Sequence, residues 1–282
     1  MAEREPSALR WLIGVELAHF RTRAGLSLAD LAAATGIKRA KLGHLETGRS
    51  TQHPDDVTKV LKACRAEQHD IDRLTSLASQ GDQSTWWAPF SEVVPDSMKT
   101  AVGLESLASA EFAYEPLLLH GMLQTPDYAA ALLVNNLRVA PMDIDRVVRV
   151  RMARQRRLTD VDNPLRYRAV IEEAVLDRLV GGPEVMRPQL EHLLDLARRD
   201  NITLHVMPLS VAVHGGLDGE ITLFDFAKTQ SIGYVEFADG AVYIQDQDQV
   251  AAHAKIAESM CRLALSPEDS IEVIRGRLAA LN

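Results

Sequence analysis

Cysteine is scarce in this chain of 282 residues, which has only Cys64 and Cys261. The two lie far apart, and neither belongs to a recurring cysteine or histidine spacing. This scarcity excludes the disulfide framework of a small secreted domain and a cysteine-based metal cage. We therefore expect a protein of a reducing compartment, with no structural metal and no other cofactor.

Long apolar runs are also lacking. The first apolar stretch, Trp11 to Leu17, is short and is interrupted by Glu16. No run approaches the ~18 apolar residues that a membrane-spanning helix needs. The charged N-terminus does not have the pattern of a signal peptide. The sequence predicts a cytoplasmic protein without a membrane partner.

The chain as a whole lacks an excess of positive charge, with 31 Lys and Arg residues against 39 Asp and Glu residues and a formal net charge of −8. A protein that coats nucleic acid would be strongly basic, so this class is excluded. The charge is unevenly divided, because residues 1–80 have a net charge of +2 and the remainder −10. A local basic site on an acidic body is typical of a regulator that selects its DNA site.

Residues 21–49, RTRAGLSLADLAAATGIKRAKLGHLETGR, have the pattern of a helix-turn-helix. Ser27 predicts a helix N-cap, and Asp30 completes a pair that is typical of a capping box. The apolar stripe of a short helix follows at Leu28, Leu31 and Ala32. Gly36 then supplies the residue type that a tight turn between helices needs, because glycine accepts positive φ.

A second short helix is predicted from near Lys38 to near Thr47, with Gly48 as its C-terminal stop. Leu42 and Leu45 form its inner side, which leaves the basic residues outward. Readout of the major groove needs such an exposed helix with Arg, Lys or His donors, and contacts to phosphates supply affinity. The alternative is a solvated basic surface without a ligand. The turn glycine and the capped preceding helix favour DNA binding.

This segment resembles the helix-turn-helix domain of the Cro/phage-repressor class, also called the xenobiotic-response-element (XRE) type. The matching residues are Arg21, Gly25-Leu26-Ser27, Leu31-Ala32, Gly36-Ile37, Leu42, Leu45-Glu46 and Gly48-Arg49. The resemblance implies a structural ion pair between Arg21 and Glu46. It also implies contacts to operator DNA: bases would be read by Arg39, Ala40 and His44, and phosphates would be held by Lys38, Lys41 and Arg49. The class often has a phosphate-contacting glutamine where this chain has Leu28.

The pattern along the chain predicts two domains. An all-α domain of five helices covers residues 1–80, a polar linker covers 81–84, and a larger α+β domain covers 85–282. The second domain is expected to hold a small, mostly antiparallel sheet, because short strand-like runs are separated by turn residues after position 164. Residues 111–158 read mostly as helix with interruptions, including a helix start at Thr125-Pro126-Asp127.

Two features of the second domain are candidates for partner contacts. Trp86 and Trp87 are adjacent, and one of them is expected at an interface while the other anchors the core. The segment Arg146–Arg157 holds six arginines and no acidic residue. It predicts either a docking surface, with Arg149 and Arg156 as contacts, or a helix that pairs with the domain's own carboxylates.

The second domain resembles the C-terminal domain of a large actinobacterial regulator family, long described as of unknown function. The matching segments are 103–105, 114–116, 121–125 with 128–129, Arg151 with 154–155, 189–190 with 192–194, 206–208, and 264–266 with Ser270. The resemblance implies an antitoxin-like regulator that binds a small protein encoded by an adjacent gene. Regulators of this class usually bind palindromic operators as homodimers, so we expect a homodimer.

Two alternatives to a partner-binding domain remain open. A small-molecule sensor would have an effector pocket in the second domain, with a few polar groups in an apolar lining. An enzyme would need a catalytic constellation, and the sequence offers only weak ones. His205, His214, Asp218 and Glu220 match no metal-ligand spacing, and the adjacent Glu172 and Glu173 point to different faces. We predict no catalytic residue and no metal site.

Overall fold

The computed structural model describes residues 7–79, 96–237 and 240–281, and these form two compact units. The first unit contains the described residues up to 79 together with 96–107 and 226–230. The second contains 108–225 and the described residues from 231 onward. Trp86, Trp87 and the linker expected at 81–84 lie outside the described residues.

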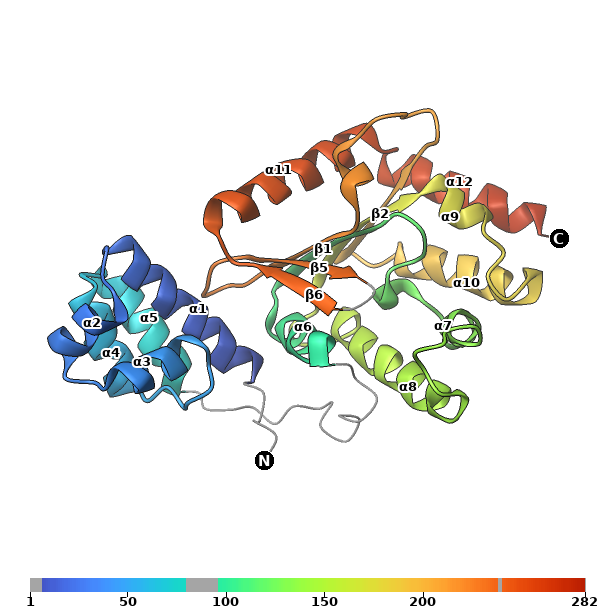
Figure 1. Ribbon diagram of the computed structural model, residues 1–282. Coiled ribbons are helices and arrows are strands. Elements are labelled where there is room, and N and C mark those ends of the chain that lie inside the picture. Colours follow the sequence, from blue (N-terminus) through green and yellow to red (C-terminus); the bar gives the residue numbers. More distant parts are fainter. Residues whose placement is uncertain (1–6, 80–95, 238–239, 282) are drawn as a thin grey trace. The chain divides into compact units, whose positions relative to one another are not determined.

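The first unit is built from helices, as predicted for the N-terminal region (Figure 1). They are α1 (Ala8–Arg23), α2 (Leu28–Thr35), α3 (Arg39–Glu46), α4 (Pro54–Ala63), α5 (Gln68–Ser79) and α6 (Asp96–Leu107). One cluster of buried side chains joins α1 to α5, and Leu17, Leu31 and Leu45 are fully enclosed in it. The first five helices therefore share a single apolar core.

Local sequence signals explain the turn between α2 and α3. The Ser27 hydroxyl accepts a hydrogen bond from the Asp30 amide, while the Ser27 amide donates to the Asp30 carboxylate, so the predicted capping box is confirmed. Gly36 ends α2 with φ of 71°, in the left-handed region that glycine adopts without strain. A side-chain cap thus fixes the start of α2 and the backbone freedom of a glycine its end, and the sequence predicted both.

Helices α1 and α3 approach each other closely enough for their backbones to touch. A Cβ atom on Gly14 would lie only 2.4 Å from the carbonyl oxygen of Glu46. A Cβ atom on Gly48 would lie 2.8 Å from the amide nitrogen of Trp11. Glycine at these two positions is therefore required for α3 to pack against α1.

Two later segments of the chain complete the first unit. Helix α6 packs against α1 so closely that a Cβ on Gly103 would lie 2.4 Å from the Cβ of Ala8. Residues 226–230 also belong to this unit, where the Gln230 amide donates to the Glu16 carboxylate at 2.8 Å. Glu16 is only 3% exposed, and Arg73 of α5 pairs with it. The residues that contact α1 here therefore come from three separate parts of the sequence: α5, α6 and residues 226–230.

The second unit is an α+β arrangement around a six-stranded sheet in the order β3-β2-β1-β4-β5-β6. The strands are β1 (Ala110–Glu115), β2 (Arg166–Glu172), β3 (Ile202–Met207), β4 (Ile221–Asp225), β5 (Ile232–Phe237) and β6 (Gly240–Ile244). The longer helices are α7 (Pro126–Leu133), α8 (Ile144–Gln155), α10 (Pro183–Leu196), α11 (Gln247–Leu263) and α12 (Pro267–Ala280). The short elements are α9 (Glu173–Asp177), η2 (Gly121–Leu123), η3 (Pro141–Asp143), η4 (Arg156–Leu158) and η5 (Gly215–Asp218).

Helices cover both faces of this sheet (Figure 1). Helix α11 lies on one face, where Ala257 and Met260 pack against Phe112 and Tyr114 of β1. Helices α7, α8 and α10 lie on the opposite side in the view of Figure 1. Helix α12 packs against α10 and β3. No described helix is long and apolar enough to cross a membrane.

The prediction of a small, mostly antiparallel sheet is wrong. Strands β1, β2 and β3 run parallel, and β4, β5 and β6 are antiparallel to their neighbours. The strand missing from the prediction is β1, which lies in the segment read as helix. Its four central residues, including Glu111, are all buried, so the sequence shows no alternation of apolar and polar residues. Strands buried on both faces lack that alternation, and their pairing is not local.

Candidate functional site

Helix α3 and the residues that flank it, Lys38 and Arg49, present the predicted DNA-contacting side chains outward. Every one of these residues is exposed: Lys38, Arg39, Ala40, Lys41, His44 and Arg49. On the opposite side, Leu42 and Leu45 are buried in the core of the first unit, with exposed fractions of 1% and 0%. The helix is only two turns long, which suits insertion of its N-terminal end into a major groove.

Lys41 differs from its basic neighbours, because it has a partner within the unit. Its ammonium lies 2.6 Å from a carboxylate oxygen of Asp56 on α4. The Lys41 side chain is 46% exposed and that of Asp56 13%. A phosphate contact by Lys41 would therefore have to compete with Asp56.

Arg21 and Glu46 form a bidentate ion pair between α1 and the end of α3. The Arg21 Nε and Nη2 atoms donate to the two Glu46 carboxylate oxygens at 2.6 and 2.9 Å. Arg21 Nη1 also donates to the Leu26 carbonyl oxygen at 2.9 Å. The hydrogen bond with Glu46 raises the pKa of Arg21 above its usual value. The pair faces the protein, with exposed fractions of 20% and 10%.

Gln52 adds a link between α1 and α3 that no sequence pattern predicted. Its side-chain amide donates to the carbonyl oxygens of Arg10 at 2.8 Å and Leu45 at 2.7 Å. The residue is only 3% exposed. A glutamine in a polar loop has no local signature for such a role, since Arg10 is distant in sequence.

Leu28 stands where the resembling class often has a phosphate-contacting glutamine. In this chain Leu28 packs against the core of the first unit as a partly buried side chain. Its Cδ1 atom lies 3.9 Å from the position that a Cβ on Gly43 of α3 would occupy. The position therefore supports the packing of α2 on α3 and cannot donate a side-chain hydrogen bond.

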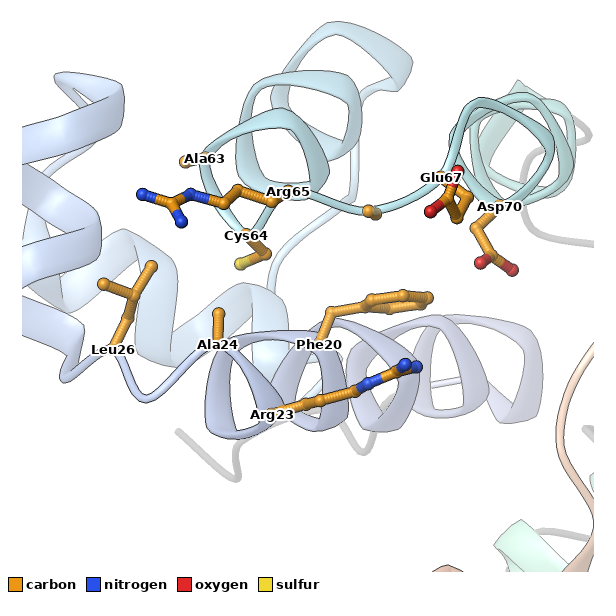
Figure 2. Close-up of a pocket in the computed structure, with 10 residues that line it drawn as sticks. Phe20, Arg23, Ala24, Leu26, Ala63, Cys64, Arg65, Glu67 and Asp70 are labelled. Carbon is orange, nitrogen blue, oxygen red and sulfur yellow. The ribbon is translucent and has the colours of Figure 1, made fainter.

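A pocket of about 480 Å³ lies in the first unit, between the end of α1 and the turn from α4 to α5 (Figure 2). Phe20 and Arg23 line it from α1, and Cys64 and Arg65 line it from the turn. No residue of α3 lines it, so it is separate from the predicted DNA-contacting surface. Burial raises the pKa of the Cys64 thiol to about 11, which keeps the sulfur protonated and a poor nucleophile.

The arginine-dense segment is α8 followed by η4, and it divides into inner and outer residues. Arg151 donates from Nη1 to the Gln124 side-chain oxygen at 2.6 Å. Arg157 donates to the carbonyl oxygens of Ala108 and Asn163, both at 2.8 Å. Arg149 and Arg156 are exposed, and within the described residues neither takes part in an ion pair. Some arginines of the segment therefore form hydrogen bonds within the unit, and two others, Arg149 and Arg156, face outward.

The segment around η2 is held by three buried or half-buried glutamines. Gln124 donates to the Leu119 carbonyl oxygen at 2.7 Å, and Gln155 of α8 donates to the carbonyl oxygens of Gly121 and Gln124. Gln189 of α10 accepts from the Thr125 amide and donates to the Leu123 carbonyl oxygen, both at 2.7 Å. Some of the residues that carried the second resemblance, those of 121–125 with Gln155 and Gln189, therefore meet here in a structural role.

Acidic side chains gather near the ends of β1, β4 and β5. Burial and the nearby charge of Glu220 raise the pKa of Glu115 to about 8. Burial likewise raises the pKa of Glu220 to about 7, and the charge of Glu236 adds to that rise. Arg151 and Arg154 oppose the rise at Glu115. The carboxyl groups of Glu115 and Glu220 therefore hold protons at a pH where surface carboxyls are ionised.

The weak catalytic candidates have structural partners. His205 Nδ1 lies 2.9 Å from the Leu265 carbonyl oxygen. His214 accepts from the Gly216 amide at 3.2 Å, and its Nε2 lies 3.3 Å from Glu172. Glu173 pairs with Arg277 of α12. Among the described residues, no group of three or more His, Cys, Asp or Glu side chains is arranged to hold a metal ion.

Two parts of the chain match known protein families. Residues 12–74 match a family described as a helix-turn-helix domain. Residues 98–276, more than half of the chain, match the family described as a domain of unknown function (DUF5753). No curated protein and no solved structure matches the chain. The first match covers the helices that carry the outward basic residues.

Replacing Glu46 by Gln should lower the stability of the first unit, because Arg21 would lose its charged partner while remaining partly buried. We expect the free energy of unfolding of the full chain to fall by about 1–3 kcal/mol. A double-mutant cycle with Arg21→Met, followed by chemical denaturation, measures the coupling. Asp56→Asn is the matched control, because Lys41 is half exposed and that pair should contribute less than about 1 kcal/mol. Coupling near zero for Arg21 and Glu46 would show that the pair is not stabilising.

The raised pKa of Glu115 predicts that stability falls as pH rises. The protonated form is favoured by folding, so its contribution is complete below the unfolded pKa of about 4.3 and is lost as pH rises through about 8. Glu115→Gln should remove about 1–3 kcal/mol of this decline between pH 5 and pH 8. Denaturant unfolding of the full chain at several pH values measures it. Glu191→Gln, on an exposed position of α10, is the control. An equal slope in wild type and Glu115→Gln would contradict the prediction.

Proposed function

Because the chain belongs to the family described as a domain of unknown function (DUF5753) and carries a helix-turn-helix domain, we propose that it is a sequence-specific DNA-binding transcriptional regulator of the XRE type. The observation that carries the proposal is the placement of α3. Its outer side bears exposed basic residues, while Leu42 and Leu45 fix its inner side in the core. The cytoplasm is the compartment where such a regulator meets operator DNA.

The proposed roles divide the outer side of α3 into two groups. Arg39, Ala40 and His44 read base edges in the major groove, where arginine and histidine donors distinguish base pairs. Lys38, Lys41 and Arg49 hold phosphates and set the register of the helix on the duplex. The ion pair with Asp56 makes the phosphate contact of Lys41 the weaker one in this group, because Asp56 competes with the phosphate for the lysine.

The proposal gives the second unit a regulatory role and assigns no catalytic step to the chain. We propose that this unit binds a small protein, encoded by an adjacent gene, in an antitoxin-like manner, and that the regulator acts as a homodimer. Arg149 and Arg156 are the proposed contacts, supported by their exposure on α8 and η4. The connection from α7 to α8 adds three large exposed apolar side chains, at Val134, Leu137 and Met142. Apolar and arginine side chains together are typical of protein interfaces.

The alternative of a small-molecule regulator requires an effector pocket in the second unit. The pocket of about 480 Å³ lies in the first unit, between α1 and the turn from α4 to α5. Its volume is within the range of ligand sites, yet charged residues such as Arg23, Arg65 and Glu67 form much of its lining. We therefore keep partner binding as the proposed role of the second unit.

DNA binding is tested by selecting preferred duplexes from a random pool and then measuring affinities of single variants. Arg39→Ala should weaken binding to the selected site by roughly 10- to 200-fold and relax the preference at one base step. Lys41→Ala should weaken binding on all duplexes and lower the salt slope by about one. Asp56→Asn should act in the opposite direction, because it frees Lys41 and removes a negative charge. Lys62→Ala, exposed on α4, is the control. Unchanged affinity and preference for Arg39→Ala would refute its role.

Partner binding is tested by co-purifying the full chain with the product of the neighbouring gene. Charge reversal of both Arg149 and Arg156 to Glu should abolish the complex, and binding to wild type should weaken steeply with salt. Arg275→Glu, a reversal on exposed α12, is the matched control and should leave the complex intact. A complex that survives the double reversal would exclude this surface as the dock. If no neighbouring protein binds, the partner role fails and the DNA-binding role stands.

A further inference from the structure

The pocket at the end of α1 has an apolar floor. Phe20 of α1 is only 8% exposed, and Cys64 at the end of α4 only 6%. Leu26 and small alanine side chains complete this apolar part. Figure 2 shows the Phe20 ring in the middle of the lining residues, with Arg65 on one side and Glu67 on the other. At about 480 Å³, the pocket has the volume of a small-molecule site.

The charged residues of the lining leave an excess of positive charge. The guanidinium groups of Arg23 and Arg65 are exposed, and neither forms a hydrogen bond or an ion pair with the described part of the chain. Asp70 is already paired with Arg73 of α5 at 2.7 Å. Two unpaired cations therefore stand against the carboxylate of Glu67. This balance favours an anion over a cation as the occupant.

Arg65 also has an unusual backbone conformation. Its φ is 56°, and among the residues that the structure describes it is the only one other than glycine with positive φ. Its amide donates to the Lys62 carbonyl oxygen at 3.1 Å, and the Ala66 amide donates to that of Leu61 at 3.0 Å. These two bonds form the Schellman motif that ends many helices, and the residue at this position of the motif is usually glycine.

Helix α1 ends beside the same pocket with the same motif, and there the residue is a glycine. Gly25 has φ of 70°, and its amide donates to the Thr22 carbonyl oxygen at 2.9 Å. The Leu26 amide donates to the Arg21 carbonyl oxygen at 3.1 Å. Arg65 thus occupies a position where glycine would be free of strain. Backbone strain that no internal polar contact of the side chain offsets is typical of residues that hold a ligand.

We propose that this pocket binds a small organic anion, with an apolar body against Phe20 and Cys64 and a carboxylate or phosphate group toward the unpaired arginines. Guanidinium groups bind both kinds of anion through paired hydrogen bonds. The site lies in the first unit and is additional to the proposed roles of α3 and of the second unit. It depends on neither of them.

The pocket adjoins the ion pair that fixes the end of α3. Leu26 lines the pocket, and its carbonyl oxygen accepts from Arg21, which also binds Glu46. A bound anion holds the turn from α1 to α2 in its folded position, so it stabilises the first unit by mass action. Because no residue of α3 lines the pocket, the anion and DNA can bind at the same time.

Binding is tested on the full chain by calorimetric titration with benzoate, 1-naphthoate and phenyl phosphate. Benzamide is the uncharged counterpart of benzoate. At least one carboxylate or the phosphate should bind and raise the Tm, and the two kinds of anion show which group the site prefers. Benzamide should bind more weakly than benzoate by roughly tenfold, because it cannot form charge-assisted hydrogen bonds with arginine.

Arg65→Gly separates ligand binding from folding. It removes the guanidinium and supplies the residue that the backbone favours, so the Tm of the free protein should stay the same or rise. Affinity for the anions should fall by roughly tenfold or more. Arg23→Gln should weaken binding in the same direction. Lys62→Gln is the matched control, because it removes one positive charge from α4 outside the pocket and should leave anion binding unchanged.

Three results would overturn the site. In the first, none of the three anions binds at millimolar concentrations. In the second, Arg65→Gly lowers the Tm and leaves anion binding unchanged, which would make Arg65 a partner of the negative end of the α4 dipole. In the third, the anions compete with the selected duplex and Arg65→Gly weakens binding to every duplex. That result would make the two arginines contacts to DNA phosphates.

Discussion

The contact on which the first unit depends is the approach of α1 to α3. Gly14 lets the α1 backbone lie against the Glu46 carbonyl, where any larger side chain would clash. The bidentate pair of Arg21 and Glu46 and the two hydrogen bonds of Gln52 then fix the end of α3. Every outward residue of α3 takes its direction from this packing. Steric contact sets the position, and polar contacts keep it.

In the second unit, side-chain hydrogen bonds hold the irregular segment around η2 in place. Turns without regular backbone pairing must find other partners for buried polar groups. Here Gln124, Gln155 and Gln189 supply them from three directions. The same glutamines tie α8 and α10 to the segment that follows β1.

The sequence predicted what local chemistry determines. The capping box of Ser27 and Asp30, the turn at Gly36 and the start of α7 at Thr125 all depend on residues a few positions apart. Strand β1 was missed because it is buried on both faces, and the parallel order of β1, β2 and β3 depends on long crossovers. Within the candidate site, the outward face of α3 was foreseeable. Gln52 and the pairing of Lys41 with Asp56 were not, because they join distant parts of the chain.

The composition of the first unit limits how the chain can be rearranged. Helix α6 and residues 226–230 lie within the span of the DUF5753 match, yet they pack on α1 of the helix-turn-helix unit. If two relatives exchanged their helices α1–α5, the break would fall after α5. The new α1 would then pack against an α6 that had evolved to fit the α1 of another protein. Ala8, Gly103 and Glu16 would have to change together with their partners. The two halves of such a chain are expected to be inherited as one piece rather than shuffled as independent modules.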